Sequence, residues 1–232
     1  MLFEVPPLEF TEIDSSILTA QKLQLLVARL DKIHPVISGN KLFKLHYFLE
    51  RAIQLGHKNI LTFGGAWSNH LVATAYSCQL AGLNSIGIVR GEITDPLSHT
   101  LKECNSYGMQ LRFVSRNDYK KKDQIHLRND LYDVPPHCFV IPEGGYDPLG
   151  AKGASMIMDL LAELHATHIC TATGTSTTLA GLMQNRSNNE TIIAIPVLKN
   201  MTDVADRISF LNQSNSTEGL VIFDDYHFGG YA

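Results

Sequence analysis

The sequence lacks the features that mark a protein for a membrane, for secretion or for nucleic acid. No run approaches the roughly 20 consecutive apolar residues that a membrane span requires. The first ten residues contain two prolines, two glutamates and no basic residue, which is unlike a secretory signal. No basic block occurs and the net charge is −4, so neither nucleic acid nor an anionic membrane is an expected partner.

Cysteine is also scarce, and its spacing indicates neither disulfides nor a redox pair. The scattered cysteines, none in a CxxC pair, are Cys78, Cys104, Cys138 and Cys170. In a chain of this size and polarity we expect reduced, mostly buried thiols and a cytoplasmic location. The one metal-like spacing is His165 and His168 followed by Cys170. Because no second ligand pair accompanies it, no metal site is expected.

Short apolar runs alternate with helical patterns along the whole chain. The composition, 44% hydrophobic and 18% charged, is that of a globular protein. The runs that predict strands are residues 59–63, 85–89, 109–115, 138–142, 168–173, 191–197 and 219–223. An amphipathic helix is predicted over residues 40–55, with Gly56 ending it. Strands separated by helices of this length predict an α/β fold with parallel sheets.

The sequence Gly39-Asn40-Lys41, with Lys44 one turn on, opens the helix predicted over residues 40–55. Asn40 is a good N-cap residue, so Lys41 lies in the first helical turn. The positive end of the helix dipole disfavours a cation there and lowers the pKa of the amine. Imine formation with an aldehyde requires a neutral amine, while Lys44 can face a phosphate. Two solvated surface lysines are the alternative interpretation.

A glycine turn after the strand at residues 59–63 carries Ser68, Asn69 and His70. Ser68 can cap the helix that follows, which is expected to run to residue 80. Free N–H groups at the start of that helix can hold a carboxylate. A structural turn with a serine cap and a packed histidine is the alternative. Trp67, the only tryptophan, either lines a pocket or belongs to the core.

A threonine-rich loop closes the strand at residues 168–173 and opens a helix. Backbone N–H and hydroxyl groups converge there, where the helix dipole favours an anion. The pattern matches neither the P-loop nor the dinucleotide glycine motif, so it favours a monophosphate. A turn without a ligand is the alternative. Tyr146, in the glycine turn after residue 142, either walls the same site or connects two halves of the protein.

Together these segments resemble the 1-aminocyclopropane-1-carboxylate deaminase / D-cysteine desulfhydrase family of pyridoxal-phosphate enzymes, over about residues 29–231. The motifs that carry the resemblance are Gly39-Asn40-Lys41 with Lys44-Leu45, Gly64-Gly65 with Ser68-Asn69-His70, Glu143-Gly144-Gly145, and Thr173-Gly174-Thr175. The resemblance implies a two-domain, tryptophan-synthase-β-like fold (fold type II) and a homodimer. Residues 1–43 and 147–232 would form the larger, cofactor-binding domain, and residues 44–146 the smaller inserted domain.

The resemblance also implies roles for individual residues. Lys41 would carry pyridoxal 5′-phosphate and then act as the base, with Ser68 and Tyr231 as further catalytic residues. The cofactor-binding residues would be Lys41, Lys44, Asn69, Thr173, Gly174, Thr175, Ser176 and Thr177. The substrate-binding residues would be Trp67, Ser68, Asn69, His70 and Tyr146. The implied reaction converts a small amino acid into a 2-oxo acid and ammonia, and His70 brings the motif nearer to the desulfhydrases.

Compared with the family pattern, the sequence ends early. Members continue into a segment that carries a tyrosine and the partner of the pyridine nitrogen, so we expect the C-terminal part of the larger domain to be missing. Two other hypotheses stay open for this reason. One is a truncated, catalytically impaired homologue that binds pyridoxal phosphate or an amino acid. The other is an α/β protein that binds a different phosphorylated metabolite.

Overall fold

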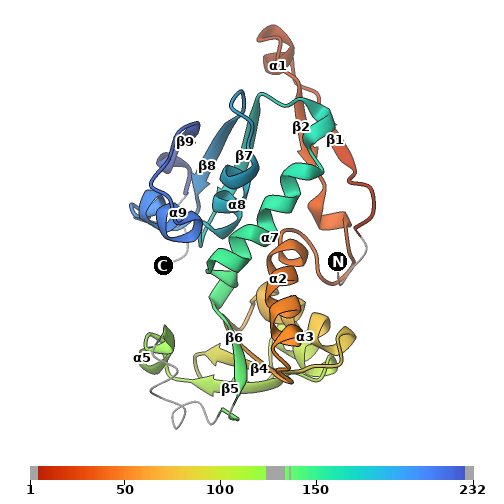
Figure 1. Ribbon diagram of the computed structural model, residues 1–232, viewed down its shortest axis with the longest axis vertical. Helices are drawn as coiled ribbons and strands as arrows, with labels where there is room; N and C mark the ends of the chain where they lie inside the picture. The colour runs from red at the N-terminus through yellow and green to blue at the C-terminus, as the bar shows by residue number, and fades with distance from the viewer. Residues whose placement is uncertain (1–4, 124–133, 136, 228–232) are drawn as a thin grey trace.

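Two parallel sheets carry the α/β alternation in the computed structural model, which describes residues 5–123, 134–135 and 137–227 (Figure 1). The first sheet has the strand order β5-β4-β3-β6 and the second has the order β7-β8-β9. The strand bounds are β3 Asn59–Gly65, β4 Asn84–Arg90, β5 Gln110–Val114, β6 Cys138–Ile141, β7 His168–Thr173, β8 Thr191–Pro196 and β9 Leu220–Ile222. Each coincides with a predicted run to within two residues, which confirms the fold class.

Helices occupy the segments between these strands. The helix bounds are α2 Lys41–Gln54, α3 Asn69–Leu80, α4 His99–Ser106, α5 Arg116–Tyr119, α7 Pro148–Asp159, α8 Thr177–Asn185 and α9 Val204–Asn212. Gly56, with φ of +75°, ends α2 as predicted, since the His57 N–H reaches back to the Ala52 carbonyl at 3.0 Å. No helix in the described ranges is long and apolar enough to cross a membrane.

An N-terminal hairpin was not predicted from the sequence. Its strands β1 (Phe10–Ile13) and β2 (Leu25–Ala28) pair antiparallel, and the short helix α1 (Ser16–Ala20) connects them. The hairpin projects from one end of the molecule (Figure 1). Each strand has only four residues, which is too short to show a clear alternation of apolar and polar positions. Several apolar side chains of the hairpin are also exposed, so burial does not follow the apolar pattern.

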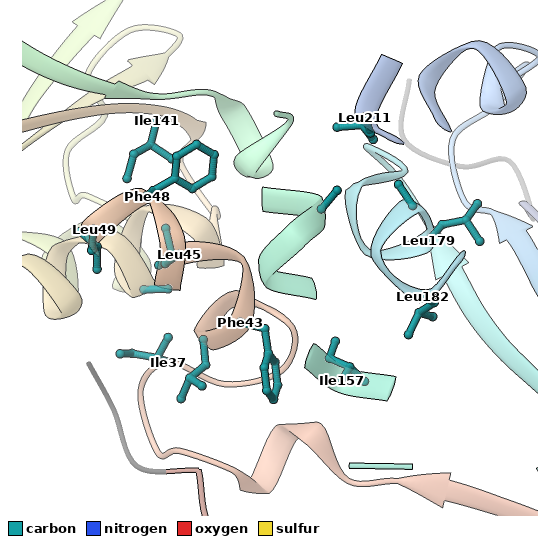
Figure 2. Close-up of a cluster of buried hydrophobic side chains, with 14 of the residues drawn as sticks. Ile37, Phe43, Leu45, Phe48, Leu49, Ile141, Ile157, Leu179, Leu182 and Leu211 are labelled. Carbon is teal, nitrogen blue, oxygen red and sulfur yellow. The ribbon is translucent and has the colours of Figure 1, made fainter. Parts of the chain in front are cut away.

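Helix α7 packs between α2 and α8, and glycine makes both contacts close. A Cβ added to Gly153 of α7 would lie 2.1 Å from the carbonyl oxygen of Phe43 in α2. A Cβ added to Gly181 of α8 would lie 2.5 Å from the carbonyl oxygen of Ala151 in α7. The largest hydrophobic cluster surrounds these contacts and draws on all three helices (Figure 2). The N-termini of α2 and α8 are thereby brought near each other.

The cysteines are free thiols, and two of them differ from the expectation of burial. Cys78 and Cys104 are buried, and burial raises the pKa of each thiol to about 12. Cys138 is only half-buried, and Cys170 is exposed. Cys170 lies in β7, an edge strand of its sheet, on a side of the strand that nothing in the described structure covers. The prediction of burial is therefore wrong for Cys170.

Candidate active site

The N-termini of α2, α3 and α8 meet at one place. Two of these helices follow the carboxyl ends of parallel strands, where ligands bind in α/β proteins. Asn40, beside α2, donates a hydrogen bond from Nδ2 to Oγ1 of Thr178 in α8 at 2.6 Å. The charges of Lys41 and Lys44 in α2 act on the ring of His70 in α3. The three loops selected from the sequence are therefore parts of one site.

Asn40 orients Lys41 and does not cap the helix with its side chain. It occupies the N-cap position of α2, as predicted, but makes no side-chain bond to a backbone N–H there. Its Oδ1 accepts a hydrogen bond from Nζ of Lys41 at 2.7 Å, while its Nδ2 is bound to Thr178. The prediction of a capping side chain is wrong, because both ends of the amide are engaged with the lysine and with α8.

Both lysines of α2 are pushed toward the neutral form. Burial lowers the pKa of Lys41, in the direction predicted, but the cause is desolvation and not the helix dipole from which it was predicted. Lys44 is only 4% exposed, and burial followed by the positive charge of Lys41 lowers its pKa to about 7. Nζ of Lys44 donates to the carbonyl oxygen of Gly144 at 3.2 Å. The alternative interpretation, two solvated surface lysines, is therefore wrong.

The turn before α3 holds Ser68 at the helix start. Ser68 caps α3 as predicted, and its Oγ accepts a hydrogen bond from the Leu71 N–H at 3.4 Å. A Cβ on Gly64 would lie 2.6 Å from this Oγ, so only glycine leaves room for the cap. Asn69, the first residue of the helix, is exposed. Because Ser68 Oγ accepts from Leu71, its hydrogen is left to donate to a ligand.

His70 is buried beside the lysines and is neutral. Its Nε2 lies 2.9 Å from Oγ1 of Thr62, which in turn donates to the carbonyl oxygen of Ile141. Burial, with the charges of Lys41 and Lys44, lowers the pKa of His70 to about 3. The ring is therefore packed against β3 and supports the start of α3, as in the structural alternative weighed for this turn.

The loop between β7 and α8 contains buried hydroxyl groups without partners. The side-chain oxygens of Thr173 and Ser176 are buried and make no hydrogen bond within the described part of the chain. Ser176 adopts a left-handed conformation with φ of +62°, and Thr175 and Thr177 share a hydrogen bond of 3.0 Å. A Cβ on Gly174 would meet no atom within 4 Å. Residues 173–177 therefore form an open loop, which we call the cradle, and two of its buried hydroxyl groups have no partner in the described structure.

Gly144 connects Lys44 to this cradle. It lies in the short helix η3 (Glu143–Gly145), and a Cβ on it would lie 2.9 Å from Cγ2 of Thr175. Its carbonyl oxygen accepts the hydrogen bond from Lys44. Lys44 and Thr175 therefore border the same small region, which places a cation next to the predicted phosphate loop.

Two other predicted site residues make aromatic contacts, and a third cannot be placed. Trp67 is 68% exposed, and its ring contacts the His99 ring with centroids 5.2 Å apart. Tyr146 stacks on Phe210 of α9 at 5.3 Å, so it connects two parts of the protein. Tyr231 lies outside the described residues.

The contacts of the site include residues that sequence reasoning missed. Thr62 and Ile141 belong to strands and have no motif that marks them, yet they hold His70. Thr178 lies in the threonine-rich run, which is the one signal that could have found it.

Two cavities of the structure were not predicted from the sequence. One of about 180 Å³ adjoins Asn69 and Ser38, and its far wall is formed by α4. A larger groove of about 630 Å³ lies at the opposite ends of α7 and α8, away from the lysines.

The sequence profile of a large enzyme family, described as pyridoxal-phosphate dependent enzyme, matches residues 9–202. The chain belongs to this family. Its members use pyridoxal phosphate, and its parallel-sheet architecture is fold type II. The cofactor expected from the resemblance is thus confirmed at the level of the family.

The chain is similar to proteins named as the deaminase and the desulfhydrase that the sequence resemblance indicated. A Thermotoga maritima protein provisionally named 1-aminocyclopropane-1-carboxylate deaminase is 31% identical over 224 residues, which span 89% of this chain and 71% of that protein. A Klebsiella pneumoniae D-cysteine desulfhydrase is 24% identical over 90% of this chain and 70% of its own length. The crystal structure of an ACC deaminase homologue superposes with a TM-score of 0.70 at 25% identity, covering 99% of this chain and 73% of that one.

The residues present fit pyridoxal phosphate. The aldehyde of this cofactor requires a neutral amine, and two amines with lowered pKa, the half-buried Lys41 and the buried Lys44, lie at the start of α2. Its phosphate requires several donors, and Thr173 and Ser176 supply buried hydroxyls that have no other partner in the described structure. Within the same described residues, no group of three or more His, Cys, Asp or Glu is placed to hold a metal ion.

Proposed function

We propose that this chain removes ammonia from a small amino acid and leaves a 2-oxo acid, using pyridoxal phosphate bound between α2 and α8. The observation that carries the proposal is the pair of lysines with lowered pKa, the half-buried Lys41 and the buried Lys44, beside a loop in which the buried hydroxyls of Thr173 and Ser176 have no partner in the described structure. The named relatives suggest two substrates of this class, D-cysteine and 1-aminocyclopropane-1-carboxylate.

The cofactor would be held at both ends. Lys41 would bind it covalently through Nζ, which Asn40 orients by the 2.7 Å hydrogen bond. The phosphate would lie in the cradle of residues 173–177, at the N-terminus of α8, where the helix dipole favours an anion. Lys44, next to Thr175 through Gly144, would supply the opposing charge, because binding a phosphate raises the pKa of the lysine back toward the cationic form. Asn69 would contact the ring hydroxyl.

Proton transfer would be the task of Lys41. Bound pyridoxal phosphate supplies an electron sink for the negative charge that develops on the substrate. The Nζ of Lys41, freed in its neutral form, takes the proton from the α carbon of D-cysteine, or from a ring carbon of the cyclopropane acid, which has no α proton. Burial lowers the pKa of Lys41 and so favours the unprotonated amine that accepts this proton. His70 stays neutral throughout and adds no competing acid.

The start of α3 would bind the substrate carboxylate. The Ser68 hydroxyl has a hydrogen to donate, and the first N–H groups of a helix have no carbonyl partner within that helix. Their helix dipole favours a negative charge. Binding the carboxylate there would hold the reacting carbon near Lys41, which is the positioning that catalysis by proton transfer requires.

The proposal also includes the domain organisation, the oligomeric state and the location of the protein. The larger domain of residues 1–43 and 147–232 and the smaller domain of residues 44–146 would border this site from two sides. The active form would be a homodimer, with Tyr231 as a catalytic residue. A cytoplasmic location is supported by the free thiols of the four cysteines.

The test begins with the visible absorbance of the purified protein incubated with pyridoxal phosphate, then borohydride reduction and peptide mass mapping. We expect one reduced adduct, on Lys41. Lys41→Ala abolishes it, Lys44→Ala weakens cofactor retention, and the exposed Lys58→Ala is the matched control. An adduct at another lysine, or none, contradicts the proposal.

Activity separates an enzyme from a protein that only binds the cofactor. Release of 2-oxo acid and ammonia is measured from D-cysteine and, in parallel, from 1-aminocyclopropane-1-carboxylate. We expect turnover with at least one of them, lost in Lys41→Ala. An intact Lys41 adduct without turnover of either acid would identify a cofactor-binding homologue that lacks the activity.

A further inference from the structure

The loop before α3 is held from outside by the first turn of α4. Ser98, the N-cap residue of α4, accepts a hydrogen bond at its Oγ from the Leu101 N–H at 3.1 Å. The same hydroxyl donates to the carbonyl oxygen of Ala66, 32 residues earlier in the chain. One side chain therefore both caps α4 and fixes the backbone of residues 66–68, which we call the 66–68 loop.

Two other contacts hold this loop: the Ser68 N–H donates to the carbonyl oxygen of Gly65 at 3.1 Å, and Ala66 packs against the hydrophobic cluster that contains Leu71 and Leu101. Trp67 is 68% exposed, and its ring contacts the ring of His99, the residue that follows Ser98. Gly64 and Gly65, which precede the loop, are the last residues of β3 and pair with Val89 and Arg90 of β4. The hydrogen bond of Ala66 and the ring contact of Trp67 both lead to the first turn of α4.

The position of the loop decides where Ser68 lies. Ser68 follows directly and caps α3, so a shift of Ala66 moves both its hydroxyl and the first N–H groups of the helix. The cavity of about 180 Å³ separates α3 from α4 at this point, with Asn69 and Val72 on one wall and His99, Thr100 and Glu103 on the other. Beside this cavity, the hydrogen bond of Ser98 to Ala66 adds a directed contact to the apolar packing of Ala66 against the cluster that contains Leu101.

We propose that Ser98 is a positioning residue for substrate binding: through its bond to Ala66 it holds Ser68 and the start of α3 where they receive the substrate carboxylate. The identity of the ligand rests on the proposed function, whereas the effect of Ser98 on the loop does not. No sequence motif marks Ser98, which lies 30 residues from Ser68 and in a different helix.

Three substitutions separate the two hydrogen bonds of Ser98. Ser98→Ala removes both. Ser98→Asp keeps a good N-cap for α4 but has no hydrogen to give to Ala66, since a carboxylate only accepts. Ser98→Thr keeps both and is the matched control. All are made in the full chain loaded with pyridoxal phosphate, and none removes a group that touches cofactor or substrate.

The first readout is the loop itself. Trp67 is the only tryptophan of the chain, so its fluorescence reports on the 66–68 loop alone. Because Trp67 is already 68% exposed, we expect acrylamide to quench it up to about 1.5-fold more effectively in Ser98→Ala and Ser98→Asp than in the wild type, and equally in Ser98→Thr. Equal quenching in all four proteins would overturn the claim that Ser98 holds the loop, whether or not the protein is an enzyme.

The second readout is amino-acid binding, followed by the absorbance of the bound cofactor during titration with D-alanine, which has no β leaving group. The loss of one neutral hydrogen bond predicts about fivefold weaker binding in Ser98→Ala and Ser98→Asp, with Ser98→Thr within twofold. With D-cysteine, KM rises by the same factor while kcat changes less than twofold.

Thermal unfolding completes the design. A purely structural role for Ser98 predicts that binding is lost only in Ser98→Ala, in step with its melting temperature, and is kept in the capped Ser98→Asp. That pattern overturns the proposal. If the wild type carries no adduct on Lys41, the proposed function is wrong, and so is the role of Ser98 in binding a substrate carboxylate. The quenching experiment then still tests whether Ser98 holds the 66–68 loop.

Discussion

Asn40 and Thr178 are 138 residues apart in the chain and are joined by a hydrogen bond of 2.6 Å between Nδ2 and Oγ1. The other end of the same amide accepts from Nζ of Lys41 at 2.7 Å. This arrangement connects the lysine that is expected to carry the cofactor to the helix that is expected to bind its phosphate. The distance between those two groups is thereby set by one side chain.

Replacing Asn40 by aspartate should slow attachment of the cofactor at neutral pH. A carboxylate beside Nζ favours the charged amine and raises the pKa of Lys41, opposing the effect of burial. The rate of adduct formation, followed by visible absorbance between pH 7 and pH 10, should shift to higher pH. Asn40→Ala, which adds no charge, is the control and should show no such shift.

Substituting Gly174 by alanine should reduce cofactor binding without reducing stability. A Cβ there meets no atom within 4 Å, and the backbone is not in the left-handed region, so the free energy of unfolding should change by less than about 0.5 kcal/mol. The added methyl group occupies the cradle, and we expect roughly tenfold weaker retention of pyridoxal phosphate on dialysis. Unchanged retention would show that the phosphate lies elsewhere.

Gly153→Ala should have the opposite effect and destabilise the fold. Its Cβ would lie 2.1 Å from the Phe43 carbonyl oxygen, so α7 and α2 must separate. We expect a loss of about 3 kcal/mol or more in denaturant unfolding, by overpacking at a backbone contact. Gly174→Ala serves as the matched control, and equal stability of the two variants would contradict the close helix contact.

The buried histidine predicts a pH dependence of stability in the cofactor-free chain. The pKa of His70 is about 3 when folded and about 6.5 when unfolded, so the unfolded state takes up a proton first as the pH falls. Stability is full above about pH 6.5 and should drop by about 2 kcal/mol at pH 5. His70→Gln should flatten this dependence in urea unfolding, whereas the exposed His168→Gln should leave it unchanged.

Substitutions of Tyr146 test whether its side chain contacts the substrate or only packs within the protein. Because its ring stacks on Phe210 and lies under the Arg207 guanidinium at 5.7 Å, we expect Tyr146→Phe to keep both KM and stability. Tyr146→Ala should lose about 1–3 kcal/mol through the removed aromatic contact. A tenfold rise of KM in Tyr146→Phe, measured with the amino acid that the protein turns over, would restore its predicted place at the substrate.

The local parts of this protein could be predicted from its sequence. The seven strands of the two parallel sheets and helix α2 follow from the spacing of apolar residues, since that spacing depends only on the geometry of each element. Gly56 and Ser68 were found for the same reason, because a helix terminus is satisfied by its own neighbours. The hairpin of β1 and β2 was missed because it is short and half-exposed.

The partners of the site residues could not be predicted in this way. Asn40 is a good N-cap by its local preference, yet its amide is taken by Lys41 and by Thr178 from a distant helix. Trp67 and Tyr146 are aromatic residues in glycine-rich turns, and nothing local decides that one is exposed and the other stacks on α9.

The sequence by itself therefore determined which elements form and which loops carry lysines, hydroxyls and a helix cap. Only the tertiary structure decided that these loops meet, that both lysines lose water and move toward the neutral form, and that Ser98 holds the 66–68 loop. The physical reason is that desolvation and hydrogen bonding depend on groups far apart in the chain, which the packing of α7 between α2 and α8 brings together.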